Sequence, residues 1–328
     1  MPETTGAIRF HKPGGPEVLQ WERVAIDAPG PEEACIKQAA IGVNFHDIYV
    51  REGLYPAPAL PAIPGLEAAG VVEAVGEGVS EVRVGDRVAY ATPRQGAYAE
   101  KRLIPAAELV PLPDSISYDI AAALMIKGMT AQYLLRRTYR VKKGETILVH
   151  AAAGGVGLIL CQWAKHLGAH VIGTVGSEEK AALARRHGCD HPILYRKENF
   201  TQRVHEITGG NGVAVVYDSV GQDSFQGSLD CLKPFGKMVS FGQSSGRVPP
   251  FEILDLMNKG SLFLTRPTLF THIAKRKDLL AIAGEMFAAI DEGVFHVEIR
   301  HSYPLREAAR AQVAIAARQT MGASILKP

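Results

Sequence analysis

The chain has 328 residues, of which 47% are hydrophobic and 21% charged, as in a folded globular protein with room for two domains. Its net charge of +2 gives no indication of a nucleic acid or an anionic membrane as a partner. We find no secretory signal, and no apolar run approaches the ~18 residues that span a bilayer. The four cysteines are isolated, which favours reduced thiols in a cytoplasmic protein over disulfides or a clustered zinc site.

Residues 6 to about 125 are predicted to be rich in short strands. Glycine and proline punctuate this region, a pattern typical of a small, partly closed β-barrel and not of helical layers. The strand candidates are residues 7–10, 34–38, 70–75 and 87–90.

The pattern changes after Pro113, where residues 120–136 have helical spacing and strands then alternate with helices. Such alternation predicts parallel strands joined by right-handed crossovers, an α/β doubly wound sheet. The strand candidates are 146–149, 170–175, 192–194, 213–217, 237–241 and 262–265, and the helix candidates are 156–167, 178–187, 198–208, 224–232 and 251–258. The tail is predicted as a helix (278–291), a strand (295–303), a helix (305–318) and a strand near 324–326.

The most informative stretch is the glycine turn between the strand at 146–149 and the helix after it. Free backbone N–H groups and the helix dipole make such a helix start an anion site. Gly154, Gly155 and Gly157 leave room for a pyrophosphate beside Val156, so we predict a dinucleotide site.

Several motifs, taken in chain order, resemble the medium-chain dehydrogenase/reductase superfamily, and within it the zinc-independent, zeta-crystallin-like NADPH:quinone oxidoreductases. They are Ile41–Tyr49, Glu52–Pro56, Pro64–Val72, Val84–Val88, Lys127–Thr130, His150–Gly157, Tyr217–Gly221 and Val239–Gly242. The resemblance implies a GroES-like domain (1–125), a Rossmann NADPH-binding domain (126–268) and a C-terminal segment (269–328) that returns to the first domain. It also implies an active site between the domains and a homodimer, for which the strand at 262–265 is one candidate contact.

Neither zinc site of the metal-dependent members is predicted here. Those members carry a catalytic cysteine near Phe45–Asp47 and a Gly-His-Glu where this chain has Gly65-Leu66-Glu67, and four clustered cysteines are absent as well. His46 with Asp47 and Glu67 remains an alternative open site, but we interpret His46 as a hydrogen-bonded histidine. The other histidines, including His150, His187 and His191, are interpreted as structural.

The preferred cofactor is predicted to be NADPH. NAD-dependent proteins place an acidic residue after the second strand, where this chain has Gly176 and Ser177 followed by Lys180. A small neutral corner with a nearby cation suits a 2′-phosphate. Tyr195 matches a tyrosine that family members place against this phosphate. Alternatively, Lys180 lies on a solvated helix face and does not contact the phosphate.

The resemblance implies further site residues. Asn44 with Lys127 or Thr130 would lie near the nicotinamide, and Arg318 matches a family arginine that reaches the cofactor, although it could also satisfy helix carbonyls. The residues expected after the fourth and fifth strands are Ser219, Val220, Phe241, Gly242 and Ser244.

The predicted activity is reduction of a quinone by NADPH. Tyr49 and Tyr55, in the expected loop 47–56, would line a flat slot and donate hydrogen bonds, with Thr130 as a second donor, unless both tyrosines serve only loop packing. One alternative is an NADPH-dependent reductase of α,β-unsaturated aldehydes or ketones. Another is an NADPH-binding protein with a structural or RNA-binding role, although the small charge argues against RNA.

Overall fold

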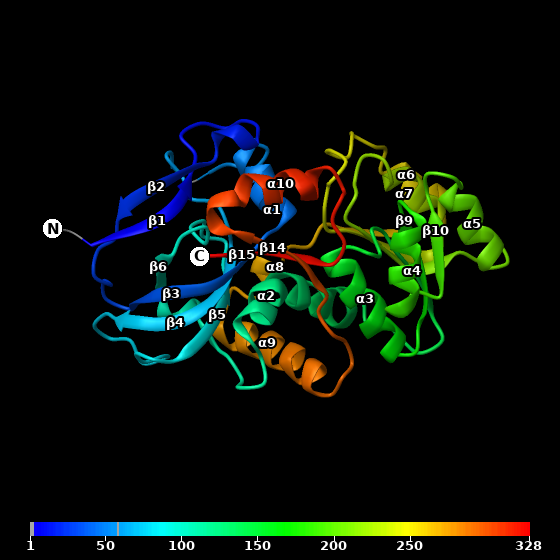
Figure 1. Ribbon diagram of the computed structural model, residues 1–328. Coiled ribbons are helices and arrows are strands. Elements are labelled where there is room, and N and C mark those ends of the chain that lie inside the picture. The colour runs from blue at the N-terminus through cyan, green and yellow to red at the C-terminus, as the bar shows by residue number, and fades with distance from the viewer. Residues whose placement is uncertain (1–2, 58) are drawn as a thin grey trace. The chain divides into compact units, whose positions relative to one another are not determined.

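The computed structural model describes residues 3–57 and 59–328 (Figure 1). The backbone divides into two compact units. The first comprises Met1–Met129, His272–Asp291 and Val297–Pro328, and the second comprises Thr130–Thr271 and Glu292–His296.

The first unit is built on mostly antiparallel strands with few helices. Its strands are β1 (Thr4–Arg9), β2 (Gln20–Ala25), β3 (Glu33–Gly42), β4 (Glu67–Val75), β5 (Arg87–Ala91), β6 (Lys101–Pro105), β7 (Val110–Pro111), β14 (Ile299–Pro304) and β15 (Ala323–Lys327). Only β14 and β15, among its described strand pairs, run parallel. Its α-helices are α1 (Phe45–Arg51), α9 (Arg276–Asp291) and α10 (Ala308–Ala316), with 3₁₀ turns at Pro16–Val18, Ala106–Glu108 and Leu305–Glu307.

The main sheet of this unit joins distant parts of the chain. Its order is β14-β15-β3-β4-β5-β7, with β6 also on β3, while β1 and β2 form a separate ribbon. Because β15 pairs antiparallel with β3, opposite Ile41 and Gly42, the C-terminal strands belong to this unit. Ile36, Tyr90 and Tyr98 are among the side chains buried in its core.

The second unit is the doubly wound sheet that strand and helix alternation predicts. Its strands run in the order β10-β9-β8-β11-β12-β13, and all neighbouring pairs are parallel. The strands are β8 (Thr146–Val149), β9 (His170–Val175), β10 (His191–Leu194), β11 (Val213–Asp218), β12 (Leu232–Ser240) and β13 (Phe263–Thr265). The order reverses between β8 and β11, where proteins of this topology bind their ligands.

Helices connect these strands. They are α3 (Gly155–His166), α4 (Glu178–Arg186), α5 (Phe200–Ile207), α6 (Phe225–Asp230), α7 (Leu254–Asn258) and α8 (Leu269–His272). Helix α2 (Tyr118–Tyr133), with a π-helical end at Leu134–Thr138, carries the chain from the first unit into the second. Among the described residues, no helix combines the length and apolarity that crossing a membrane requires.

Several predicted boundaries were wrong. The helix expected at 251–258 begins only at Leu254, after Pro249 and Pro250, and the strand expected at 295–303 begins at Ile299, opposite Ala323. Helix α10 follows a 3₁₀ turn and ends two residues before Arg318. In the β-rich region, the short helix α1 was not predicted, and neither were β2, β6 and β7.

The start of α3 depends on Gly157. A Cβ at this position would lie 2.3 Å from the carbonyl oxygen of Ala151 and 2.8 Å from the Cα of Ala152, both backbone atoms that cannot turn aside. Gly284, on an exposed face of α9, would place a Cβ in open space.

We therefore expect Gly157→Ala to lower the thermal unfolding midpoint and Gly284→Ala to raise it. Alanine favours a helix over glycine by up to about 1 kcal/mol where space allows, so the second variant measures propensity without a clash. Differential scanning calorimetry of both variants tests this, and a Gly157→Ala protein as stable as the wild type would contradict it.

Candidate active site

A closed ring of hydrogen bonds joins Asn44, Glu67 and Lys127 in the first unit. The Lys127 Nζ donates to Glu67 Oε1 at 2.8 Å and to Asn44 Oδ1 at 2.9 Å. The Asn44 Nδ2 donates to the same Glu67 oxygen at 2.8 Å. Glu67 is fully buried and Lys127 is 6% exposed, so the two form a buried ion pair. The side-chain amide of Asn44 hydrogen-bonds to both members of this pair.

Three elements hold the ring. Glu67 begins β4, Asn44 immediately precedes α1, and Lys127 lies on α2. The backbone N–H of Ile126 donates to Glu67 Oε2 at 2.6 Å. Gly42 leaves the space that the carboxylate occupies, since a Cβ there would lie 2.2 Å from Glu67 Oε1.

Asp47 is the second buried carboxylate beside this ring. Its Oδ2 accepts from the backbone N–H of Asn44 and the hydroxyl of Tyr98, each at 2.9 Å, and its Oδ1 has no hydrogen-bond partner. Burial raises the pKa of Asp47 to about 7, with a smaller upward contribution from Glu67, while the two hydrogen bonds and Lys127 oppose the rise. Asp47 is thus a carboxyl group that changes its charge near neutral pH.

An aromatic cluster borders the ring along α1. His46 and Tyr49 are three residues apart and share a helix face, and Tyr55 packs against both, with ring centroids 5.2 and 5.3 Å away. Burial lowers the pKa of His46 to about 4, so its imidazole is neutral at pH 7. The expectation that Tyr49 lies in a loop was wrong, because α1 extends to Arg51.

The second unit presents the glycine turn at the carboxyl end of β8. Helix α3 begins at Gly155, and the N–H groups of its first turn have no intrahelical partner. Gly154, Gly155 and Val156 are all partly exposed there. The turn can therefore accept an anion against backbone donors.

The residues predicted to bind a 2′-phosphate follow β9. Tyr195 lies against Gly176, since a Cβ there would sit 3.0 Å from the tyrosine hydroxyl. Ser177 caps α4 by accepting from the backbone N–H of Lys180 at 3.3 Å. The Glu178 carboxylate pairs with Lys197 at 3.1 Å, which partly offsets its negative charge at this corner.

The loops after β11 and β12 are tied to each other. The N–H of Ser244 donates to the carbonyl of Ser219 at 3.1 Å, and that of Ser245 to Val220 at 2.9 Å. Gly242 permits this approach, because a Cβ would lie 2.6 Å from the Ser219 oxygen. Together with Phe241, these residues follow two adjacent strand ends, beside the glycine turn in strand order.

Thr130 and Arg318 are the two remaining predicted residues. Thr130, which is 6% exposed, lies three residues after Lys127 on α2 and hydrogen-bonds to Tyr133. Arg318 is exposed in the stretch between α10 and β15, with a positive φ of 57°.

Two family descriptions match the chain. Residues 30–114 match the alcohol dehydrogenase GroES-like domain, and residues 155–279 match the zinc-binding dehydrogenase family. A quinone oxidoreductase of Pseudomonas aeruginosa is 52% identical, over 98% of this chain and 99% of its own. A 2-haloacrylate reductase of a Burkholderia species is 47% identical, over 98% of each chain. The crystal structure of Escherichia coli quinone oxidoreductase complexed with NADPH has a TM-score of 0.97 and 49% identity, over 98% of this chain and all of that one.

The chain belongs to the quinone oxidoreductase family of the medium-chain dehydrogenase/reductase superfamily. The GroES-like and Rossmann folds that the sequence predicted for this quinone oxidoreductase family member are confirmed.

The zinc of the wider dehydrogenase family does not fit the residues present. Leu66 replaces a ligand, and the carboxylate of Glu67 is bonded to an ammonium, an amide and a backbone N–H. A divalent ion beside Glu67 would face the positive charge of Lys127 at 2.8 Å from the same oxygen. In this family member, Lys127 and Asn44 therefore already hydrogen-bond to the Glu67 oxygen that a metal ion would need as a ligand.

Sequence reasoning considered Glu67 and Asp47 only as alternative metal ligands and missed their actual partners. Tyr98, which hydrogen-bonds to Asp47, carried no motif of its own. Asp218 was also missed, although it lies within the Tyr217–Gly221 motif. Its carboxylate accepts from Ser224 and Ser228, and Ser228 in turn contacts the buried His150.

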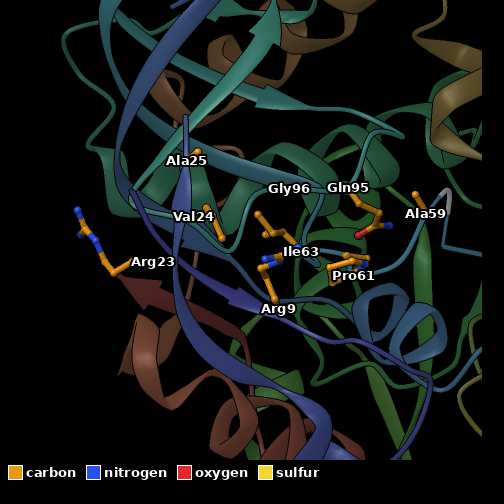
Figure 2. Close-up of a pocket in the computed structure, with 10 residues that line it drawn as sticks. Arg9, Arg23, Val24, Ala25, Ala59, Pro61, Ile63, Gln95 and Gly96 are labelled. Atoms are coloured by element: carbon orange, nitrogen blue, oxygen red, sulfur yellow. The ribbon is translucent and has the colours of Figure 1, made fainter. Parts of the chain in front are cut away.

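A separate hollow of about 590 Å³ lies in the first unit and contains none of the predicted site residues. Figure 2 shows the side chains of Arg9, Ile63 and Gln95 gathered there, while the Arg23 guanidinium points away. Arg9 is paired with Glu22 at 2.9 Å, so the hollow presents little uncompensated charge.

The buried Asp47 makes stability depend on pH. A carboxyl group with a pKa of about 7 in the folded state and 3.8 when unfolded binds its proton more tightly when folded. Its contribution to the free energy of unfolding is therefore constant below about pH 4, falls as pH rises towards 7, and is constant again above that.

We expect Asp47→Asn, which keeps an acceptor for Asn44 and Tyr98 but has no charge, to gain stability relative to the wild type between pH 5 and pH 8. Urea unfolding of both proteins at the two pH values measures this. A stability difference that does not change with pH would show that Asp47 is ionised in the folded protein throughout this range.

Proposed function

We propose that this protein oxidises NADPH and passes the reducing equivalents to a quinone without zinc. The observation that carries this proposal is the Asn44–Glu67–Lys127 ring, whose residues Asn44 and Glu67 adjoin the positions at which zinc dehydrogenases carry metal ligands. The chain is also about half identical to quinone oxidoreductases over its full length. Bound NADPH would supply hydride chemistry, and the side chains would bind and orient the reactants.

Each member of the ring has a role in this proposal. Glu67 is a positioning residue that fixes Asn44 and Lys127 through one hydrogen bond each, while the backbone N–H of Ile126 holds its second oxygen. Asn44 and Lys127 would face the nicotinamide end of the cofactor, with Thr130 as a further donor on α2. The hydrogen bonds of the ring would keep these donors oriented.

The aromatic cluster of His46, Tyr49 and Tyr55 suits a flat acceptor. The rings of Tyr49 and Tyr55 meet edge to face at 5.3 Å, and each phenol can donate one hydrogen bond. A quinone would stack on a ring and place an oxygen at a phenol, where negative charge develops on reduction.

The cofactor preference for NADPH rests on the corner of Gly176, Ser177, Lys180 and Tyr195. No carboxylate directly follows β9, and Glu178 is paired with Lys197. The glycine turn of Gly154, Gly155 and Val156 would hold the pyrophosphate, and the tied loops of Ser219, Val220, Phe241, Gly242 and Ser244 would border the ribose and the bridge to nicotinamide. Arg318 would contact the cofactor from the C-terminal region.

A second activity is reduction of α,β-unsaturated carbonyl compounds. The 2-haloacrylate reductase, 47% identical to this chain, favours it, because that name denotes reduction of a conjugated double bond. Both activities need the same cofactor site, so they differ only in the acceptor.

We further propose a homodimer in the cytoplasm. Edge strand β13 of the second unit carries Phe263, which is 57% exposed, and Ile253 and Met257 nearby in the chain are 80% and 61% exposed. Four buried, unpaired thiols are typical of a reducing compartment. We expect wild-type protein to sediment as a dimer and Phe263→Asp to sediment as a monomer, and a monomeric wild type would refute the assembly.

The activity is tested by following NADPH absorbance with EDTA-treated protein, using ortho- and para-quinones beside simple enals and 2-haloacrylate. We expect fast oxidation with quinones that survives chelation and is much weaker with NADH. Faster turnover of the conjugated acids or enals would support the second activity. Tight NADPH binding without reduction of any acceptor would refute both enzymatic proposals and favour a structural or RNA-binding role.

Binding of NADPH and of NADH is also measured for Lys180→Ala. The matched control is Lys142→Ala, which removes an exposed lysine of the same unit. A charge-assisted hydrogen bond contributes about 1.5–3 kcal/mol, so loss of Lys180 should weaken NADPH binding roughly 10- to 100-fold. NADH binding should be unchanged in both variants. Equal weakening for the two cofactors would show that Lys180 does not contact the 2′-phosphate.

A further inference from the structure

Two histidines that are far apart in the sequence meet in the second unit. His187 follows α4 and is buried, and His296 is exposed at the end of the segment Glu292–His296. Their Nε2 atoms lie 3.0 Å apart, with ring centroids at 4.7 Å and an angle of 46° between the rings. The sequence indicated only a structural role for His187, and neither residue lies in a cofactor motif.

The tautomer of His187 is set by its other ring nitrogen. Its Nδ1 lies 2.9 Å from the carbonyl oxygen of Leu183, which can only accept a hydrogen bond. Nδ1 therefore carries the proton, and in the neutral ring the Nε2 lone pair faces His296. A backbone carbonyl on the far nitrogen is the usual arrangement of a histidine that binds a metal.

His296 is also held in place. The side chain of Gln162 on α3 donates to the carbonyl of His296 and accepts from its N–H, both at 3.1 Å. The adjacent Phe295 stacks on Trp163, with ring centroids at 5.3 Å and an angle of 28°. The backbone of His296 is thus fixed by one helix while His187 is fixed by another.

We propose that His187 and His296 form a binding site for a divalent transition metal ion, Zn²⁺ or Ni²⁺, through the Nε2 atom of each ring. Imidazole nitrogen is a preferred ligand of these ions. Two bonds of about 2.0–2.1 Å at a tetrahedral angle require the nitrogens to be about 3.4 Å apart, so the rings need to separate by only a few tenths of an ångström. Water can complete the coordination.

The ion would act on stability and not on the reaction. It would link the segment Glu292–His296 to the end of α4, and neither histidine belongs to the cofactor residues named above. An ion that binds only the folded chain raises the thermal midpoint as its concentration increases.

The test is isothermal titration calorimetry of Zn²⁺ and of Ni²⁺ into EDTA-treated protein that carries no polyhistidine tag. We expect about one ion per chain in the wild type. His296→Ala and His187→Gln should each weaken binding by roughly tenfold or more. His191→Ala, which removes an exposed histidine of the same unit, should bind like the wild type.

A second measurement tests the proposal without His187→Gln, so its outcome does not depend on whether that variant folds. In a Trp21→Phe background, Trp163 is the remaining tryptophan, and its stacking on Phe295 places it beside the proposed site. Ni²⁺ should quench its fluorescence in that background and not after His296→Ala, an exposed change. Unaltered binding in His296→Ala, or wild-type binding weaker than about 1 mM, would overturn the proposal.

Discussion

The buried ion pair between Lys127 and Glu67 is the interaction on which the first unit's candidate site depends. Removing two charges from water costs several kcal/mol per ion, and only good geometry offsets that cost. Here Asn44 and the backbone N–H of Ile126 complete the hydrogen bonds of the carboxylate. Losing one member of the pair leaves an uncompensated buried charge, which typically costs about 3–5 kcal/mol. The ring therefore ties β4, the start of α1 and α2 together.

The neighbouring Asp47 carboxyl group has weaker hydrogen-bond and charge partners than Glu67. Glu67 faces a full positive charge at 2.8 Å, whereas Asp47 receives only two neutral hydrogen bonds and leaves Oδ1 without a partner. Two carboxyl groups in one buried region thus differ in the partners that compensate them. Glu67 organises its neighbours electrostatically, while Asp47 introduces a dependence on pH near neutrality.

The proposed cofactor site of the second unit would bind a highly charged ligand with few charged side chains. In the proposed site the donors would be mainly backbone N–H groups at the start of α3, where a side chain at Gly157 would collide with the turn. The carboxyl ends of β8, β9, β11 and β12 lie at one edge of the parallel sheet, so each following loop can contribute one contact. The His150–Ser228–Asp218 network buried behind these loops holds them without taking part in the site.

The sequence by itself determined the Rossmann unit and its glycine turn, because these features depend on local residue order and strand–helix periodicity. The positions that carry zinc ligands in metal-dependent relatives came only from the resemblance to that superfamily. The sequence was less informative about the first unit, where short strands such as β6 are defined by pairing with β3 and not by their own pattern. Only the tertiary structure brought Lys127 to Glu67 and Asn44, since these residues are separated by up to 83 positions and meet through the packing of α2. The pairing of His187 with His296, 109 positions apart, was invisible for the same reason: a contact between distant segments leaves no period or spacing in a single sequence.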